Sequence, residues 1–212
     1  MEIIPVKEQD KNEIIEISKY SFEWGDYIDQ VFDLWLKEGI FIKAVEENKI
    51  LGFLHIRLYD KFAWFEGLRV SPEARRTGVG TELTKMAIHL SQRKINRLMI
   101  RESNKPSLSL SSKLSFYEID RVYYREGEKM DFDDIIKKYG LKKLKIQLKD
   151  NFVNDWVYFD YFYYNDHIYG NDSGLKLIRT DPPFILSGSI DEESLSKNSG
   201  DECFIIFERT SP

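Results

Sequence analysis

Two arginines, a threonine and two glycines stand together in a short polar stretch, Arg75-Arg76-Thr77-Gly78-Val79-Gly80. The stretch opens directly into residues 79–90, whose apolar side chains recur every three or four positions and predict a helix. The first N–H groups of a helix have no intrahelical acceptor and favour negative charge. Glycines let the backbone approach an anion closely, and arginines supply positive charge. The chemistry that these residues predict is the binding of phosphate.

Two well-known phosphate-binding loops do not fit this stretch. It lacks the G-x-x-x-x-G-K-[ST] pattern of a Walker loop. Residues 78–83 lack the third glycine of the dinucleotide fingerprint, and no β-α-β unit precedes them. In isolation, the stretch would most simply be a strand-to-helix turn with solvated arginines, and its flanks change that interpretation.

With its flanks, the stretch resembles the R/Q-x-x-G-x-G/A loop of the GCN5-related N-acetyltransferase (GNAT) family. As in that family, it follows a strand that ends in Leu68-Arg69-Val70 and a proline turn at Ser71-Pro72. The resemblance implies that the loop binds the pyrophosphate of acetyl-coenzyme A (acetyl-CoA). It also implies that the backbone of residues 68–70 contacts the pantetheine arm.

Residues 104–116 resemble a second pattern of the same family, N-x-x-A-x-x-L-Y-x-K-x-G-F. Four positions match, namely Asn104, Leu110, Lys113 and Phe116. Ser115 replaces the glycine, which predicts a backbone that is either relaxed or strained there. Ser111 replaces the tyrosine. The two patterns imply these cofactor-binding residues: Leu68, Arg69, Val70, Arg75, Arg76, Thr77, Gly78, Val79, Gly80, Thr81 and Asn104.

Acetyl transfer to an amine requires a group that takes the amine proton and donors that stabilise the thioester oxygen. The resemblance implies that a backbone N–H of residues 68–70 stabilises the oxygen. It also favours Glu66 as general base, because several members have a glutamate four residues before the end of this strand. Alternatively, Glu66 is exposed, or it is paired with Arg69 or His55. His55 as base or relay is a further hypothesis.

The family's tyrosine usually protonates the departing thiolate of coenzyme A. Ser111 is shorter and far less acidic, so it is a poor replacement for that acid. Tyr117, Tyr123, Tyr124 or water could take over the role.

The elements that must position these residues are three strands over 41–46, 50–58 and 62–70, joined by short polar turns. If Asp60-Lys61 is a two-residue hairpin loop, Tyr59 pairs with Phe62, and His55 lies opposite Glu66 on one face.

A strand over residues 1–6 and helices over 7–20 and 26–37 precede these strands. A strand over 97–101, a helix beginning at Pro106 and a strand over 116–125 follow the phosphate-loop helix. In the resemblance the first two helices border the acceptor site. Phe22, Trp24 and Tyr27 then either line a pocket or belong to the core.

We therefore predict an α/β (α+β) protein whose GNAT-type domain covers residues 1–128. Its mixed, mostly antiparallel, twisted sheet is flanked by helices. Residues 129–212 predict a small β-rich extension with a helix over 131–140. The strands expected there cover residues 144–148, 156–164, 175–179, 184–190 and 203–208.

Residues 156–164 contain seven aromatic side chains. We interpret this run as a buried strand, a homodimer interface or a wall of the substrate site.

The composition of the chain argues against several classes of function. The chain of 212 residues has a formal net charge of −5, and the acidic excess lies in residues 131–212, so we expect no nucleic-acid partner. The sequence has no apolar run near the ~20 residues that span a membrane, and a cytoplasmic location is expected. One cysteine and three scattered histidines argue against a metal site.

The sequence thus predicts an N-acetyltransferase with acetyl-CoA as cosubstrate. It would transfer the acetyl group directly to a primary amine of a small molecule, protein or peptide. The alternative is a non-catalytic acyl-CoA-binding or protein-interaction module that retains the fold.

Overall fold

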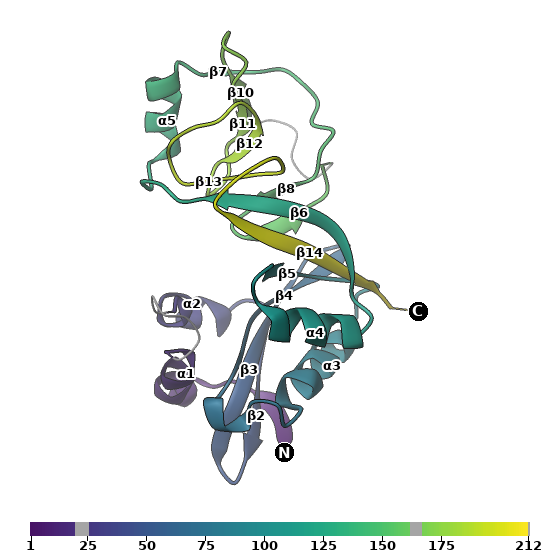
Figure 1. The fold of residues 1–212 in the computed structure, drawn as a ribbon. Coiled ribbons are helices and arrows are strands. Elements are labelled where there is room, and N and C mark those ends of the chain that lie inside the picture. Colours follow the sequence, from purple (N-terminus) through teal and green to yellow (C-terminus); the bar gives the residue numbers. More distant parts are fainter. Residues whose placement is uncertain (20–25, 162–166, 212) are drawn as a thin grey trace. The chain divides into compact units, whose positions relative to one another are not determined.

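The computed structural model describes residues 1–19, 26–161 and 167–211. They form two compact units (Figure 1). The first comprises Met1–Leu98, Pro106–Tyr117 and Phe207–Pro212, and the second comprises Met99–Lys105 and Glu118–Ile206. The chain therefore passes between the units several times. The sequence-based boundary between residues 128 and 129 is a single cut and stays a prediction.

The sheet of the first unit begins with five strands in the order β1-β2-β3-β4-β5. Neighbouring strands are antiparallel except β4 and β5, which are parallel. The strand bounds are β1 Glu2–Pro5, β2 Ile40–Glu46, β3 Lys49–Leu58, β4 Phe62–Val70 and β5 Ile95–Arg101. The mixed, mostly antiparallel sheet predicted from the sequence is thus confirmed.

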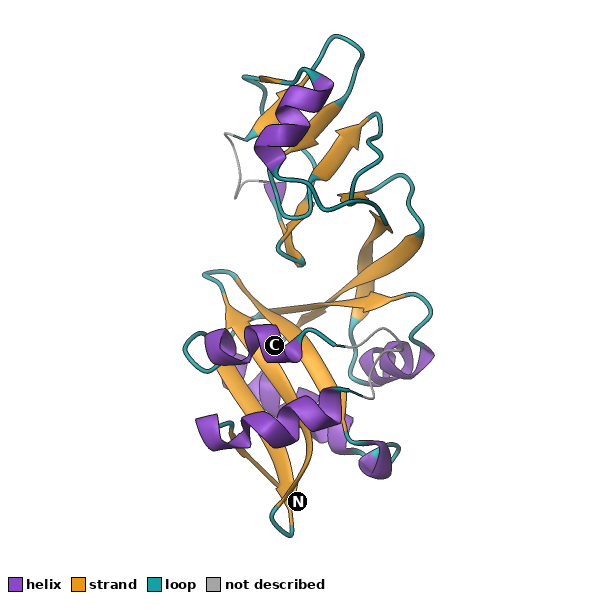
Figure 2. Cartoon of the chain, turned by 90° about the vertical axis from the view of Figure 1, so that its left-hand side faces the viewer, coloured by secondary structure: helices purple, strands orange, loops and turns teal. Residues whose placement is uncertain are grey.

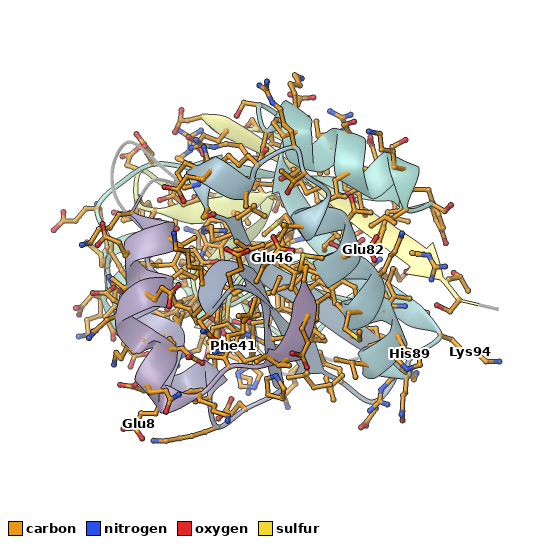
Figure 3. All side chains as sticks on the ribbon, turned by 90° about the horizontal axis from the view of Figure 1, so that it is seen from below. Glu8, Phe41, Glu46, Glu82, His89 and Lys94 are labelled. Atoms are coloured by element: carbon orange, nitrogen blue, oxygen red, sulfur yellow. The ribbon has the colours of Figure 1, made fainter. Side chains whose placement is uncertain are left out.

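Helices lie against both faces of this sheet, α1 and α2 on one side and α3 on the other (Figures 1 and 2). The helical bounds are η1 Glu8–Asp10, α1 Lys11–Ser18, α2 Ile28–Trp35, η2 Pro72–Ala74, α3 Val79–Ser91 and α4 Lys105–Lys113. Phe32 and Trp35 of α2 pack in one apolar cluster with Phe41 and Phe53 of β2 and β3. Figure 3 shows Phe41 amid the packed elements, whereas Glu8 and Lys94 lie at the periphery.

The hairpin between β3 and β4 has the predicted register. The Tyr59 N–H donates to the Phe62 carbonyl at 2.9 Å, and Asp60 and Lys61 form the loop. His55 lies directly opposite Glu66. The prediction succeeds because a two-residue loop determines which residues pair along both strands.

The second unit is rich in strands, in the order β14-β6-β13-β12-β11-β10-β7, with β8 and β9 forming a separate hairpin. The bounds are β6 Tyr117–Arg125, β7 Lys142–Lys143, β8 Phe152–Asn154, β9 Val157–Phe159, β10 Ile168–Gly170, β11 Lys176–Ile178, β12 Phe184–Ser187, β13 Ser194–Ser196 and β14 Glu202–Thr210. The α-helix α5 of this unit spans Phe132–Tyr139. Asp131 caps its start, and Gly140, with φ of +60°, ends it.

Three predicted strands of this unit are wrong in extent. Residues 144–148 form no strand, because the ladder with β10 contains only Lys142 and Lys143 and is followed by a single bond from the Leu144 N–H to the Ile168 carbonyl. The strand predicted over residues 184–190 ends at Ser187. Trp156 lies in the β8–β9 turn with φ of +59°, so β9 begins at Val157.

The described part of the aromatic run favours the buried-strand interpretation. Val157 and Tyr158 are buried, whereas Tyr161 is exposed. Phe162, Tyr163 and Tyr164 lie outside the described residues, and the homodimer stays a prediction.

Candidate functional site

The predicted phosphate loop lies between η2 and α3. Gly78 is the N-cap of α3 and has φ of +97°, a conformation that glycine adopts without a Cβ penalty. The first intrahelical bond runs from the Glu82 N–H to the Gly78 carbonyl at 3.0 Å, and no side chain caps the helix. The N–H groups of Val79, Gly80 and Thr81 therefore precede the hydrogen-bond ladder, where they can bind an anion.

Side chains of this loop supply charge and shape. Arg75 and Arg76 are exposed. The Thr77 hydroxyl donates to the Ala74 carbonyl at 2.7 Å, so its single proton tightens the loop. A Cβ at Gly80 would lie 3.6 Å from both Leu110 and Val70, which is ordinary contact. Position 80 thus has room for glycine or alanine, as the family pattern requires.

Strand β4 is irregular at the point where the pantetheine arm is expected. Phe53 pairs with Arg69 and His55 with Glu66, so the single residue Leu54 opposes both Gly67 and Leu68. Gly67 has φ of +66°, which makes this a bulge that leaves one residue of β4 out of the ladder. On its other edge, β4 pairs with β5 only as far as Phe65. Beyond Phe65, this edge of β4 has no strand partner among the described residues, so N–H groups there can donate to a ligand.

Glu66 lies immediately before this bulge and belongs to a charged cluster. Its Oε1 lies 2.7 Å from Nδ1 of His55 and 2.7 Å from Nε of Arg57. The side chain of His55 is buried, and that of Glu66 is 12% exposed. The pairing of Glu66 with His55, one of the alternatives from the sequence, is therefore present, while Glu66 keeps limited access to solvent.

The other side of His55 is held by α2 and the turn after it. Nε2 of His55 lies 2.7 Å from the Glu38 carbonyl oxygen. The Trp35 ring stacks on the imidazole at 4.5 Å with an interplanar angle of 6°. A Cβ at Gly67 would approach the Trp35 ring to 2.3 Å, so glycine at the bulge also makes room for this ring.

Arg69 is committed to a different partner. Its Nε and one terminal nitrogen donate to both carboxylate oxygens of Asp26, at 2.7 and 3.1 Å. Its other terminal nitrogen donates to the Leu68 carbonyl at 3.2 Å. Burial disfavours the charged guanidinium, but Asp26 and Tyr27 together outweigh that effect, and the pKa of Arg69 is raised. The side chain therefore braces the bulged strand.

Tyr27 lies at the same end of the site. Its ring packs edge-on against Trp35, with the centroids 6.2 Å apart, and the Arg69 guanidinium lies 5.6 Å from its centroid. Burial raises the pKa of the Tyr27 hydroxyl, and Arg69 opposes that effect. Phe22 and Trp24, the other predicted pocket residues, lie outside the described residues.

Ser111 is a buried residue of α4, and its carbonyl accepts from the N–H groups of Leu114 and Phe116. Ser115 has φ of +62°, so the strained alternative predicted for this position is the correct one. Asn104 lies in the exposed turn before α4 and belongs to the second unit. Its contact with the cofactor stays a prediction.

Two of the tyrosines considered as replacement acids have other partners. Tyr117 is half exposed, and its hydroxyl donates to Glu208 at 3.0 Å. Tyr124 belongs to the second unit, where its hydroxyl donates to Glu193 at 3.0 Å. Burial, together with that carboxylate, raises the pKa of Tyr124 to about 12, which makes it a weaker acid. Tyr123 lies on the same strand, β6.

Sequence reasoning missed Arg57, Asp26 and Gly39. Arg57 had a usable signal, because residues two apart on a strand share a face and His55 was already placed opposite Glu66. Asp26 and Gly39 had none, since each acts through a residue distant in the sequence.

Among the described residues, no cluster of histidine, cysteine and carboxylate side chains could hold a metal ion. None of their helices is long and apolar enough to span a membrane.

The fold and the loop are those of the GNAT type. The model of the acetyltransferase (GNAT) family matches residues 11–116, and the chain belongs to this family. Acetyl-CoA is the cosubstrate of the family, and the free N–H groups, the two loop glycines and the open edge of β4 fit it. A comparison with curated proteins found no match.

Solved structures share the fold at low sequence identity. A candidate acetyltransferase from Thermoplasma acidophilum aligns over 100% of both chains with a TM-score of 0.69 and 15% identity. One from Pyrococcus horikoshii aligns over 100% of this chain and 89% of its own, with a TM-score of 0.62 and 14% identity. The ribosomal-protein-S18-alanine N-acetyltransferase of Escherichia coli aligns over 99% and 92%, with a TM-score of 0.54 and 14% identity.

Proposed function

We propose that this protein transfers the acetyl group of acetyl-CoA directly to a primary amine, with Glu66 as the general base. The observation that carries the proposal is that Glu66 directly precedes the bulge of β4, just after the pairing of β4 with β5 ends, and that its side chain is 12% exposed. A base there lies next to the backbone that the family uses to hold the thioester. Acetyl-CoA supplies an activated acetyl carbonyl.

Residues of this chain bind the cofactor, stabilise the developing negative charge and take the proton of the amine. The N–H groups at the start of α3, with Arg75 and Arg76, hold the pyrophosphate. A backbone N–H of residues 68–70 stabilises the thioester oxygen as negative charge develops. Glu66 takes the proton of the amine, which can then attack.

Cofactor binding is tested by thermal denaturation with and without millimolar acetyl-CoA. A ligand at 100 times its Kd stabilises the fold by about 2.7 kcal/mol, and for a chain of this size the Tm should rise by roughly 5–10 °C. The Arg76→Glu, Gly80→Asp variant should lose the shift. Lys94→Glu is the charge-matched control, because Lys94 is exposed beyond the opposite end of α3. No shift in the unmodified protein would contradict acetyl-CoA binding.

Catalysis is tested by screening amines for release of the coenzyme A thiol, with Glu66→Gln as the key variant. Loss of the base should lower kcat by about 10²–10⁴-fold while the Tm shift with acetyl-CoA persists. Equal turnover in Glu66→Gln and in the unmodified protein would exclude Glu66 as base.

The second candidate is a non-catalytic acyl-CoA-binding module. The observation that favours it is Ser111, at the position of the family's proton donor, together with the engagement of Tyr117 and Tyr124 elsewhere. A Tm shift without turnover of any amine would favour this module.

A further inference from the structure

The cluster around Glu66 uses one carboxylate oxygen twice. His55 Nδ1 and Arg57 Nε both lie 2.7 Å from Oε1 of Glu66. The other oxygen, Oε2, has no partner among the described residues. Two donors from neighbouring positions of β3 therefore determine how the carboxylate is turned and which oxygen it presents.

Hydrogen-bond chemistry places the protons of His55. The Glu38 carbonyl can only accept, so Nε2, at 2.7 Å from it, carries a proton. An ionised carboxylate also only accepts, so Nδ1 carries a proton when Glu66 is charged. Arg57 favours the charged carboxylate because its guanidinium lies on the same oxygen. In this arrangement both ring nitrogens of His55 face acceptors, so neither offers a lone pair to a substrate.

The surroundings hold the His55 ring in this orientation. Trp35 stacks on the ring at 4.5 Å with an interplanar angle of 6°. The other ionisable groups at this end of the site, Arg69 and Asp26, form an ion pair of their own, and Tyr27 lies against them.

We propose that Arg57 and His55 are positioning residues that occupy Oε1 of Glu66 and leave Oε2 as the atom that receives the amine proton. The inference rests on the proposed function and deepens it. In the step, the ammonium of the acceptor loses one proton to Oε2. The freed nitrogen forms the N–C bond, and the C–S bond breaks with its electron pair on the thiolate. His55 has no lone pair available and is not the base.

The state of His55 is measured without any acceptor. In the His89→Gln, His167→Gln variant, His55 is the single histidine, and nitrogen-15 NMR of the ring reports both protons. We expect a proton on both ring nitrogens in the unmodified protein. A neutral ring with an unprotonated Nδ1 in the presence of Glu66 would overturn the proposal.

The role of Arg57 is measured with the amine found by the screen. Loss of the Arg57 guanidinium frees Oε1 and lets the carboxylate turn, so in Arg57→Ala we expect kcat to fall by about tenfold or more while the KM for acetyl-CoA is unchanged. Arg57→Lys, which can still donate to Oε1, should restore part of kcat. Arg93→Ala is the matched control, because Arg93 donates to the Tyr59 carbonyl at the far end of the hairpin. A kcat in Arg57→Ala equal to that of the unmodified protein would overturn the positioning role.

The two failures are distinguishable. If no amine is acetylated although acetyl-CoA raises the Tm, the proposed function fails, and the NMR result still decides the arrangement of the cluster. If turnover is found and His55 is neutral, the function stands and this proposal is wrong.

Discussion

At the scale of the residue, the site depends on places where a side chain is missing. Gly39 has φ of +77°, and a Cβ there would lie 2.2 Å from the Ile56 carbonyl oxygen and 2.8 Å from Nε2 of His55. Glycine therefore lets the turn after α2 approach His55 closely enough for the Glu38 carbonyl to accept its proton. Gly67 does the same for Trp35 at the bulge.

Gly39→Ala should lower the free energy of unfolding by about 2–4 kcal/mol, since it combines a left-handed alanine with a clash against backbone. Urea denaturation measures the change. Gly174→Ala is the control, because Gly174 also has a positive φ, +91°, but no atom within 4 Å of a built Cβ. That control should cost only about 1 kcal/mol. Equal losses in both variants would refute the close approach at Gly39.

At the scale of the element, α4 ends under strain. Ser115 follows the helix in the left-handed conformation, where serine is less stable than glycine. The family pattern has glycine at this position, so the sequence alone indicated that something differs here. In the structure, Ser115 has the left-handed conformation that glycine would adopt there, although this conformation is less stable for serine.

Ser115→Gly should therefore raise the free energy of unfolding by about 1 kcal/mol. Ser112→Gly, a substitution of the same chemistry within α4, should lower it by a similar amount, because glycine weakens a helix interior. In thermal denaturation, the Tm should rise in Ser115→Gly and fall in Ser112→Gly. A loss of stability in both would mean that the end of α4 is not strained.

At the scale of the whole molecule, the first unit depends on the last residues of the chain. Arg97 of β5 donates to Glu208 of β14 at 2.9 Å, and the arginine side chain is 6% exposed. Both residues belong to the first unit, although they are 111 positions apart. A fragment cut after residue 128 would leave Arg97 buried without this carboxylate.

Glu208→Gln should lower the free energy of unfolding by about 3 kcal/mol, because the buried guanidinium of Arg97 loses the charge of this carboxylate. Asp33→Asn is the control, since Asp33 pairs with Lys11 at the surface with 66% of its side chain exposed, and should cost less than about 1 kcal/mol. Chemical denaturation of the full chain compares them. A loss of less than about 1 kcal/mol in Glu208→Gln would mean that the ion pair between Arg97 and Glu208 does not make the first unit depend on β14.

The sequence by itself determined the local features of this protein. The loop from Arg75 to Gly80 was readable because its glycines, its charges and the helix that follows are adjacent in the chain. The opposition of His55 and Glu66 was readable because a two-residue turn and a period of two set the register.

Only the tertiary structure decided which groups meet across distant segments. The Glu38 carbonyl on His55, Asp26 on Arg69 and Glu208 on Arg97 each join residues 17 or more positions apart. No local pattern encodes such pairs, because they depend on how helices pack on the sheet and how the chain returns to it. The same reason explains the lost strand at residues 144–148, since a strand needs a partner that the segment itself does not contain.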